Sequence, residues 1–350
     1  MHLRILAGLA GVLALSGCEE AKPLQRETPQ DEIITALDKH AKDIQRGNPE
    51  TSLSVAVIRD GKVEFIRLYD KSIRGKTVVG AQEPIFEVAS LGKPVFAYLT
   101  LKLVDLDILS LERPLYQYAP DLFESADPRL KRITARMLLS HTSGLTNFDE
   151  KDPLKLRFDP GTEFTYSGSG YALLQQVLER RTGLNLETLA RIHVFEPLGM
   201  TSTSFLWQHA YNYRIRFGYD KDGDRITGKR KPTTGNAAWS LHTTAGDYAR
   251  FLAAMMDEGV EPEVKEWMLS KHKTITGKIS WSMGWGIQAT KPNSSIWHWG
   301  SNPGYRSYTV GYPEEDLGIV VLSNNEKLFE GIEPLILHTI GGTLPSYHWF

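Results

Sequence analysis

Cysteine is almost absent from this sequence, since Cys18 is the only one among 350 residues. A single cysteine excludes an internal disulfide and any metal site built from several thiolates. Neither sign of charge predominates, because the formal net charge is -2 and the pI is about 6.6, so nothing favours nucleic acid as a partner. Internal repeats and low-complexity segments are lacking too. The length leaves room for one large domain or two closely packed ones, and we expect neither a metal nor another cofactor.

The N-terminal apolar run, residues 5–15, is too short to span a bilayer. Its length and position are typical of the hydrophobic region of a secretory signal peptide. The next residues, Leu15-Ser16-Gly17-Cys18, resemble the bacterial lipobox, in which the chain is cleaved before the cysteine and the cysteine is lipidated. We therefore predict a signal peptide over residues 1–17 and a lipid anchor on Cys18. The alternative is an ordinary signal peptide with an incidental cysteine.

The residues after Cys18 add to this interpretation. Residues 18–30 are polar and contain proline, as in a tether. Glu19, and not an aspartate, follows the cysteine, which resembles the pattern of outer-membrane lipoproteins. We expect a protein of the bacterial cell envelope, held to the outer membrane by its lipid and facing the periplasm.

A hydroxyl and an amine lie three residues apart at the start of the most apolar internal segment. Ser90 and Lys93 stand at the beginning of residues 91–106, which are apolar on nearly every face of a helix, and such a helix lies inside a large domain. Residues i and i+3 share a helix face, so the two side chains can form a hydrogen bond. Burial lowers the pKa of a lysine, and a neutral amine can take the serine proton and so activate the nucleophile.

The same two residues also have an ordinary interpretation, as a helix cap followed by a lysine whose amine reaches solvent. A second Ser-x-x-Lys, from Ser270 to Lys273, shows that the pattern alone is weak. The polar segment after that second copy offers no apolar helix to bury the amine. We therefore assign the nucleophile to Ser90 and the base to Lys93.

Periodicity along the chain predicts an α+β fold. The predicted strands are residues 52–58, 63–69, 283–287, 295–299, 305–312 and 317–323, and the main predicted helices are residues 33–44, 91–106, 133–139, 172–181, 245–256 and 328–340. Strands at both ends of the chain imply one antiparallel sheet flanked by helices, with a mostly helical insertion at about residues 110–240. We expect the folded domain to cover residues 31–345.

Two further residues lie where a ligand could be reached. Tyr166 precedes a glycine-rich stretch, Ser167-Gly168-Ser169-Gly170, in which the backbone can approach a ligand closely. Packing of the Tyr166 ring on the core is the alternative. His141 lies in a tight link, where we favour hydrogen bonding to the backbone over a catalytic role.

Three short motifs occur in an order and at separations that resemble a known superfamily. They are Ser90-Leu91-Gly92-Lys93, Tyr166-Ser167-Gly168 and His298-Trp299-Gly300. Together they resemble the motifs of serine β-lactamases and penicillin-binding proteins. The most similar branch contains class C β-lactamases, D-alanyl-D-alanine carboxypeptidases and related esterases, and the resemblance covers about residues 31–345.

This resemblance implies an acyl-serine mechanism in a cleft between the sheet and the helical part. Ser90 would attack a carbonyl carbon, Lys93 would hold or take the proton, and Tyr166 would pass it to the leaving group. The backbone N–H groups of Ser90 and Ser301 would form the oxyanion hole. Gly300 would line the substrate site beside them.

Two positions depart from the β-lactamase pattern. Gly168 stands where an asparagine amide would contact the substrate, and His298 replaces a lysine that would bind a carboxylate. Histidine titrates near neutral pH, so we expect the chemistry of His298 to be pH-sensitive. The departures favour a hydrolase of small esters or amides, with D-amino-acid peptides of the cell wall as candidate substrates. The alternatives are a class C-like β-lactamase and a catalytically weak, penicillin-binding-like envelope protein.

Overall fold

A nine-stranded antiparallel sheet forms the centre of the computed structural model, which describes residues 22–71, 74–80, 83–148, 154–257, 259–289 and 294–348. The strand order is β3-β2-β1-β11-β10-β9-β8-β7-β6, so strands from both ends of the chain meet where β1 pairs with β11. The strands are β1 Leu53–Arg59, β2 Lys62–Tyr69, β3 Arg74–Thr77, β6 Lys273–Thr274, β7 Ile279–Trp281, β8 Gly286–Gln288, β9 Ser295–Asn302, β10 Tyr305–Tyr312 and β11 Leu317–Ser323. The predicted sheet is therefore confirmed.

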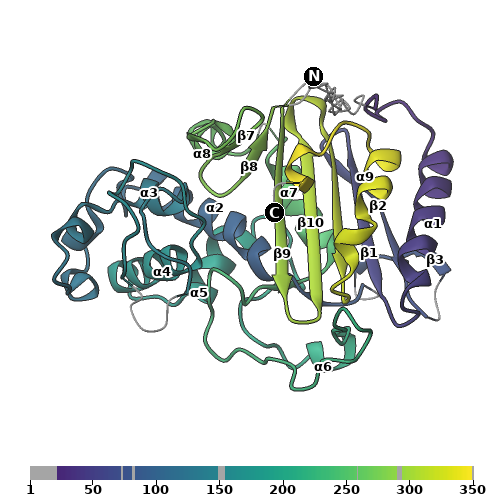
Figure 1. The fold of residues 1–350 in the computed structure, drawn as a ribbon, viewed down its shortest axis with the longest axis horizontal. Coiled ribbons are helices and arrows are strands. Elements are labelled where there is room, and N and C mark those ends of the chain that lie inside the picture. Colours follow the sequence, from purple (N-terminus) through teal and green to yellow (C-terminus); the bar gives the residue numbers. More distant parts are fainter. Residues whose placement is uncertain are drawn as a thin grey trace, which may run out of the picture.

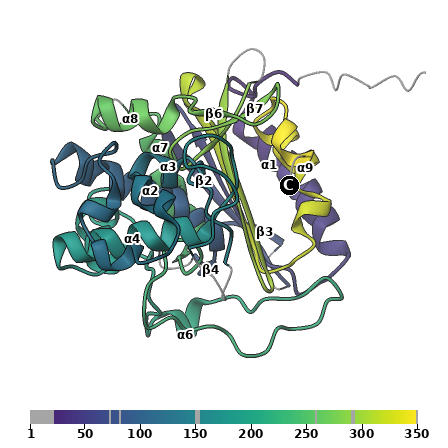
Figure 2. The same cartoon turned by 60° about the vertical axis from the view of Figure 1, so that its left-hand side comes forward.

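Helices cover both faces of the sheet (Figures 1 and 2). On one face, α1 (Gln30–Arg46) and α9 (Ile332–Thr339) pack on alternate residues of β1, such as Val55 and Val57. On the other face, Ala56 and Ile58 of the same strand join the core that contains α2 (Gly92–Asp105) and α7 (Ala245–Ala254). This alternation of two buried faces explains why β1 reads as a nearly continuous apolar run.

Most of the predicted helical insertion lies beside α2, on the left of Figure 1, whereas its last helix, α6, lies at the bottom, below the sheet. Its helices are α3 Ala135–Leu139, α4 Gly168–Thr182, α5 Leu186–Ala190 and α6 Tyr211–Arg214, followed after the insertion by α8 Pro262–Leu269. Side-chain N-caps begin several of the helices, including α3, α4, α5 and α7. Ser167 accepts a hydrogen bond from the Gly170 N–H at the start of α4, and Thr244 accepts one from the Asp247 N–H at the start of α7, as expected for N-caps.

One predicted strand is displaced. Residues 283–285 do not continue a strand, because β7 ends at Trp281 and β8 begins only at Gly286. Gly284 has φ +102°, and a Cβ there would lie 2.5 Å from the Cβ of Ala97. The apolar residues of this segment are buried against α2 in a tight turn, and that burial produced the strand-like pattern.

The boundary between tether and domain also differs from the prediction. The backbones of Lys22 and Gly342 exchange two hydrogen bonds of 3.1 and 2.8 Å, and the Gln25 N–H donates to the Ile340 carbonyl at 3.0 Å. Gly341 lies so close that a Cβ on it would be 2.0 Å from the Pro23 carbonyl oxygen. Residues 22–29 are thus attached to the domain and are not a free tether. The predicted signal peptide and Cys18 lie outside the described residues.

Candidate active site

Ser90 lies in a strained turn that leads into the buried helix. The 3-10 turn η2 covers Ala89–Leu91, and α2 begins at Gly92, so Ser90 precedes the α-helix instead of lying in its first turn. Ala89 has φ +50°, a left-handed conformation that costs a non-glycine residue about 1–3 kcal/mol. Such strain is found where surrounding structure enforces the geometry of a functional residue. The spacing of three residues to Lys93 is preserved.

Lys93 is a buried amine held beside the serine. Its Nζ lies 2.9 Å from Oγ of Ser90 and donates a hydrogen bond of 2.9 Å to the Ala238 carbonyl. The side chain is 1% exposed, and this burial lowers the pKa of Lys93 to about 7. A sizeable fraction of the amine is therefore neutral at neutral pH and able to accept the Ser90 proton.

Tyr166 lies against the same amine. Nζ of Lys93 is 4.8 Å from the centre of the Tyr166 ring. Burial raises the pKa of Tyr166, and the nearby Ser90 hydroxyl partly offsets that rise, although the Tyr166 hydroxyl makes no well-formed hydrogen bond within the described part of the chain. Tyr166 thus stays protonated at neutral pH. Tyr166 can therefore donate a proton, whereas the partly neutral Lys93 amine can accept one.

His298 on β9 is in a different state from the one predicted. Its Nδ1 donates to the Trp299 carbonyl at 2.8 Å, and its ring lies 5.5 Å from that of Trp281. Burial and the neighbouring charge of Lys93 lower the pKa of His298 to about 3, despite the opposing bond to Trp299. The expectation that His298 titrates near neutrality is therefore wrong. It is a neutral acceptor, whose Nε2 has no partner among the residues described.

His141 makes the backbone hydrogen bond that was predicted for it. Its Nδ1 accepts from the Ser167 N–H at 3.1 Å, and its ring stacks at a tilt 4.4 Å from that of Tyr166. Burial, with the charge of Lys93 as a further cause, lowers the pKa of His141 well below its ordinary value. His141 therefore positions the loop that carries Tyr166.

Gly300 allows β9 to come very close to the serine turn. A Cβ on Gly300 would lie 2.1 Å from the Val88 carbonyl oxygen and 2.3 Å from Oγ of Ser307. No side chain fits in that space, so glycine is required. Ser301 follows it at an exposed position of β9, beyond the segment that pairs with β8. The structure thus brings the two segments of the predicted oxyanion hole together.

Gly168, where an asparagine was expected, is covered by residues that the sequence analysis missed. Its N–H donates to Oδ1 of Asn147 at 2.7 Å, and a Cβ would lie 2.3 Å from the ring of Phe148. Phe148 itself has φ +48°, and its N–H donates to Oγ of Ser169. The side chain of Phe148 therefore fills the space next to Gly168.

The second Ser-x-x-Lys does not form a comparable pair. Ser270 ends α8 and Lys273 lies in β6, where its Nζ donates to the Thr162 carbonyl at 2.5 Å. The assignment of the buried pair to Ser90 and Lys93 agrees with this difference.

Comparison with known proteins identifies the family. The family model described as Beta-lactamase matches residues 37–336, so the chain belongs to the β-lactamase family. Penicillin-binding protein 4 of Amycolatopsis lactamdurans is 26% identical over 287 residues, which are 72% of this chain and 75% of that protein. Protein flp of Staphylococcus aureus (strain MRSA252) is 22% identical over 84% of this chain, which spans 63% of the length of flp.

Solved structures share the fold. A class C beta lactamase superposes with a TM-score of 0.72 at 22% identity, covering 84% of this chain and 93% of its own. D-alanine carboxypeptidase AmpC from Burkholderia cenocepacia gives 0.74 at 21% identity, with 88% and 99% covered. These matches confirm the predicted α+β architecture. In the described part of the chain, no helix combines the length and the apolar character needed to cross a bilayer.

Proposed function

We propose that this protein is a serine hydrolase that cleaves esters or amides through an acyl-serine intermediate. The observation that carries the proposal is the buried Lys93 amine 2.9 Å from Oγ of Ser90, with its pKa lowered to about 7. A serine next to a neutral amine has the general base that covalent catalysis needs.

The proposed reaction has two halves. Oγ of Ser90 attacks the carbonyl carbon while Lys93 takes the hydroxyl proton, and the N–H groups of Ser90 and Ser301 stabilise the oxyanion. The bond to the leaving group breaks as Tyr166 donates its proton, and the protonated Lys93 restores that proton to Tyr166. Water then hydrolyses the acyl-serine ester, which releases a carboxylic acid and frees Ser90.

Simple esters and D-amino-acid amides are the proposed substrates, ahead of penicillins and cephalosporins. The support is the site itself, where Gly168 carries no amide and His298 carries no charge. A β-lactamase is the second candidate, because the family model bears that name and Ser90 with Lys93 suffices for acylation by a β-lactam.

Intact-mass measurement after incubation with a fluorophosphonate and with a penicillin tests the proposal. We expect one label on the protein, located on Ser90 by peptide mapping, and none on a Ser90→Ala variant. A label on another residue, or unchanged turnover by Ser90→Ala, would refute the assignment of Ser90 as the nucleophile. An unlabelled wild-type protein would favour the alternative of a catalytically weak binding protein.

Turnover rates then distinguish the proposed ester or amide hydrolase from a β-lactamase. We expect kcat/KM to be higher for a p-nitrophenyl ester or a D-alanyl-D-alanine peptide than for nitrocefin. If nitrocefin has the highest kcat/KM of the three substrates, the β-lactamase becomes the favoured function.

We further propose that Cys18 is the lipidated first residue of the mature protein, held at the outer membrane and facing the periplasm. The lipobox-like Leu15-Ser16-Gly17-Cys18 supports this. A Cys18→Ala variant should remain unprocessed by lipoprotein maturation, and finding it processed and membrane-held like the wild type would contradict the anchor.

A further inference from the structure

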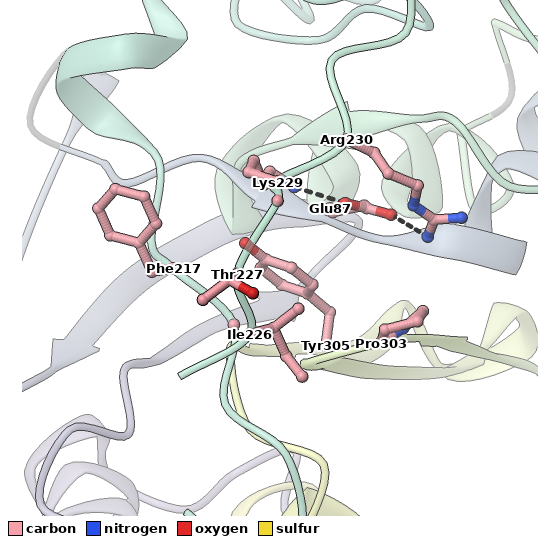
Figure 3. Close-up of a pocket in the computed structure, with 10 residues that line it drawn as sticks. Glu87, Phe217, Ile226, Thr227, Lys229, Arg230, Pro303 and Tyr305 are labelled. Atoms are coloured by element: carbon pink, nitrogen blue, oxygen red, sulfur yellow. Dashed lines mark hydrogen bonds and ion pairs between the residues drawn. The ribbon is translucent and has the colours of Figure 1, made fainter. Parts of the chain in front are cut away.

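A pocket of about 270 Å³ lies between the end of the β9–β10 hairpin and the loop of residues 217–230 (Figure 3). Apolar side chains of Phe217, Ile226 and Tyr305 form part of its lining, and Glu87, Lys229 and Arg230 lie at its charged end. Glu87 belongs to β4 (Phe86–Glu87), three residues before Ser90. The pocket lining and Ser90 are therefore connected along the chain by residues 87–90.

The charged end of the pocket has more basic than acidic side chains. Glu87 is 3% exposed, and its carboxylate pairs with Lys229 and Arg230, each at 2.5 Å. Burial opposes ionisation of Glu87, but the two cations lower its pKa overall, so the carboxylate is charged. Lys229 and Arg230 thus place two basic side chains against one carboxylate. Burial lowers the pKa of Lys229, although Glu87 opposes this change, so Arg230 carries the more permanent charge.

Arg230 is the cation available to a ligand. One guanidinium nitrogen, Nη2, pairs with Glu87, while the side chain is 42% exposed, so donors remain on the open side of the planar group. The guanidinium also stacks 4.6 Å from the ring centre of Trp239. Stacking and the ion pair hold it in one orientation, which suits recognition of a planar anion.

Two contacts connect this cation with the catalytic residues. Trp239 follows Ala238, whose carbonyl accepts the hydrogen bond from Lys93. Asn302 follows Ser301 on β9, and its amide donates to Glu87 and, at 3.1 Å, to the Trp239 carbonyl. Arg230 is therefore built onto the same framework that holds the base and the oxyanion segment.

We propose that Arg230, supported by Lys229, binds a carboxylate of the substrate, so that the enzyme prefers esters or amides bearing a short aliphatic group that ends in a carboxylate. This inference rests on the proposed function and names its substrate class. His298 is neutral and supplies no charge for such a group, whereas Arg230 does. The apolar lining of the pocket accommodates the aliphatic stem, and the guanidinium pairs with its end.

The test compares substrates that differ only in the charge. One pair is p-nitrophenyl hydrogen glutarate and its methyl ester, with the carboxylate on the acyl side. The other is 3-carboxypropyl phenylacetate and its methyl ester, with the carboxylate at the end of a short aliphatic leaving group. We expect the wild type to prefer the charged member of at least one pair by about tenfold in kcat/KM, and Arg230→Gln to abolish most of that preference. Arg230→Lys should retain part of it.

Lys231→Gln is the matched control, because it removes the same charge from the next residue, whose amine donates instead to Oδ1 of Asn212 at 3.0 Å. This variant should keep the preference. Equal rates for both members of each pair in the wild type, or an unchanged preference in Arg230→Gln, would overturn the subsite.

A binding measurement separates failure of the subsite from failure of the proposed hydrolase. Glutarate should bind the inactive Ser90→Ala protein at least about tenfold more tightly than it binds Ser90→Ala/Arg230→Gln, as followed by ligand-observed NMR. Equal binding would refute the subsite whether or not any ester is turned over. Ester turnover absent from the wild type, with glutarate binding intact, would refute the hydrolase alone.

Discussion

The pH dependence of catalysis should report the protonation of Lys93. With the pKa of Lys93 at about 7, roughly half of the amine is neutral at pH 7, and the neutral fraction falls about tenfold per pH unit well below that value. A lysine at its ordinary pKa of 10.5 would be only about 0.03% neutral at pH 7. We therefore expect kcat/KM to rise with pH up to about 7 and then to level off.

The three titratable rings next to Lys93 should not produce this inflection. Burial raises the pKa of Tyr166, lowers that of His298 to about 3, and lowers that of His141 well below its ordinary value. The three rings therefore do not change charge near pH 7. An inflection there belongs to Lys93.

The assay is hydrolysis of a p-nitrophenyl ester between pH 5.5 and 10, with the Ser90→Ala protein as the blank for spontaneous hydrolysis. A His298→Gln variant should keep the inflection near pH 7 even if its rate is lower. A rate that still rises about tenfold per unit between pH 8 and 10 would show that Lys93 titrates as an ordinary lysine, and would refute the reasoning. Loss of the inflection in His298→Gln would assign it to the histidine.

Two further predictions concern packing and stability. Gly300→Ala places a methyl group 2.1 Å from the Val88 carbonyl oxygen. Fluorophosphonate labelling of Ser90 in this variant should therefore slow by about tenfold or more. The control is Gly277→Ala, whose methyl group meets open space and which should be labelled at the wild-type rate. Lys93→Met should raise the free energy of unfolding at pH 7 in urea titrations. The unfolded chain binds more protons than the folded one between pH 7 and 10.5, so wild-type stability rises with pH in that window. Removing the buried amine should add about 4 kcal/mol to the free energy of unfolding at pH 7, and loss of its two hydrogen bonds should subtract about 1–3 kcal/mol. This gain should disappear by pH 10.5. An equal gain at pH 7 and pH 10.5 would contradict the lowered pKa of Lys93.

The hydrogen-bonded pair of Ser90 and Lys93 could be predicted because its sequence signal is local. Ser90 and Lys93 are three residues apart and precede an apolar helix, and both facts are visible in the sequence. The sheet could be predicted for a similar reason, since short apolar, β-branched runs that end at turn residues mark β1, β2, β10 and β11. The exact bounds of a strand and the strand that it pairs with were harder to predict from the sequence, as the displaced strand at residues 283–285 shows.

The remainder of the site depends on contacts between distant segments. The Ala238 carbonyl holds the Lys93 amine through the backbone, and a backbone contact has no characteristic residue type. The charge state of His298 follows from its burial beside Trp281 and Lys93, not from its being histidine. Phe148 covers Gly168 from a separate, earlier loop, and only the folded chain brings them together.

The attachment of residues 22–29 to the domain limits how far the active site can be from a membrane. A free tether over residues 18–30 would extend about 40 Å, whereas the four residue steps from Cys18 to Lys22 extend at most about 14 Å. If Cys18 carries the lipid, the domain is therefore confined to a layer close to the bilayer surface, and its orientation is restricted by the fixed point at which the chain leaves it. Substrates would be met at that surface, and a polymer anchored farther away would be out of reach.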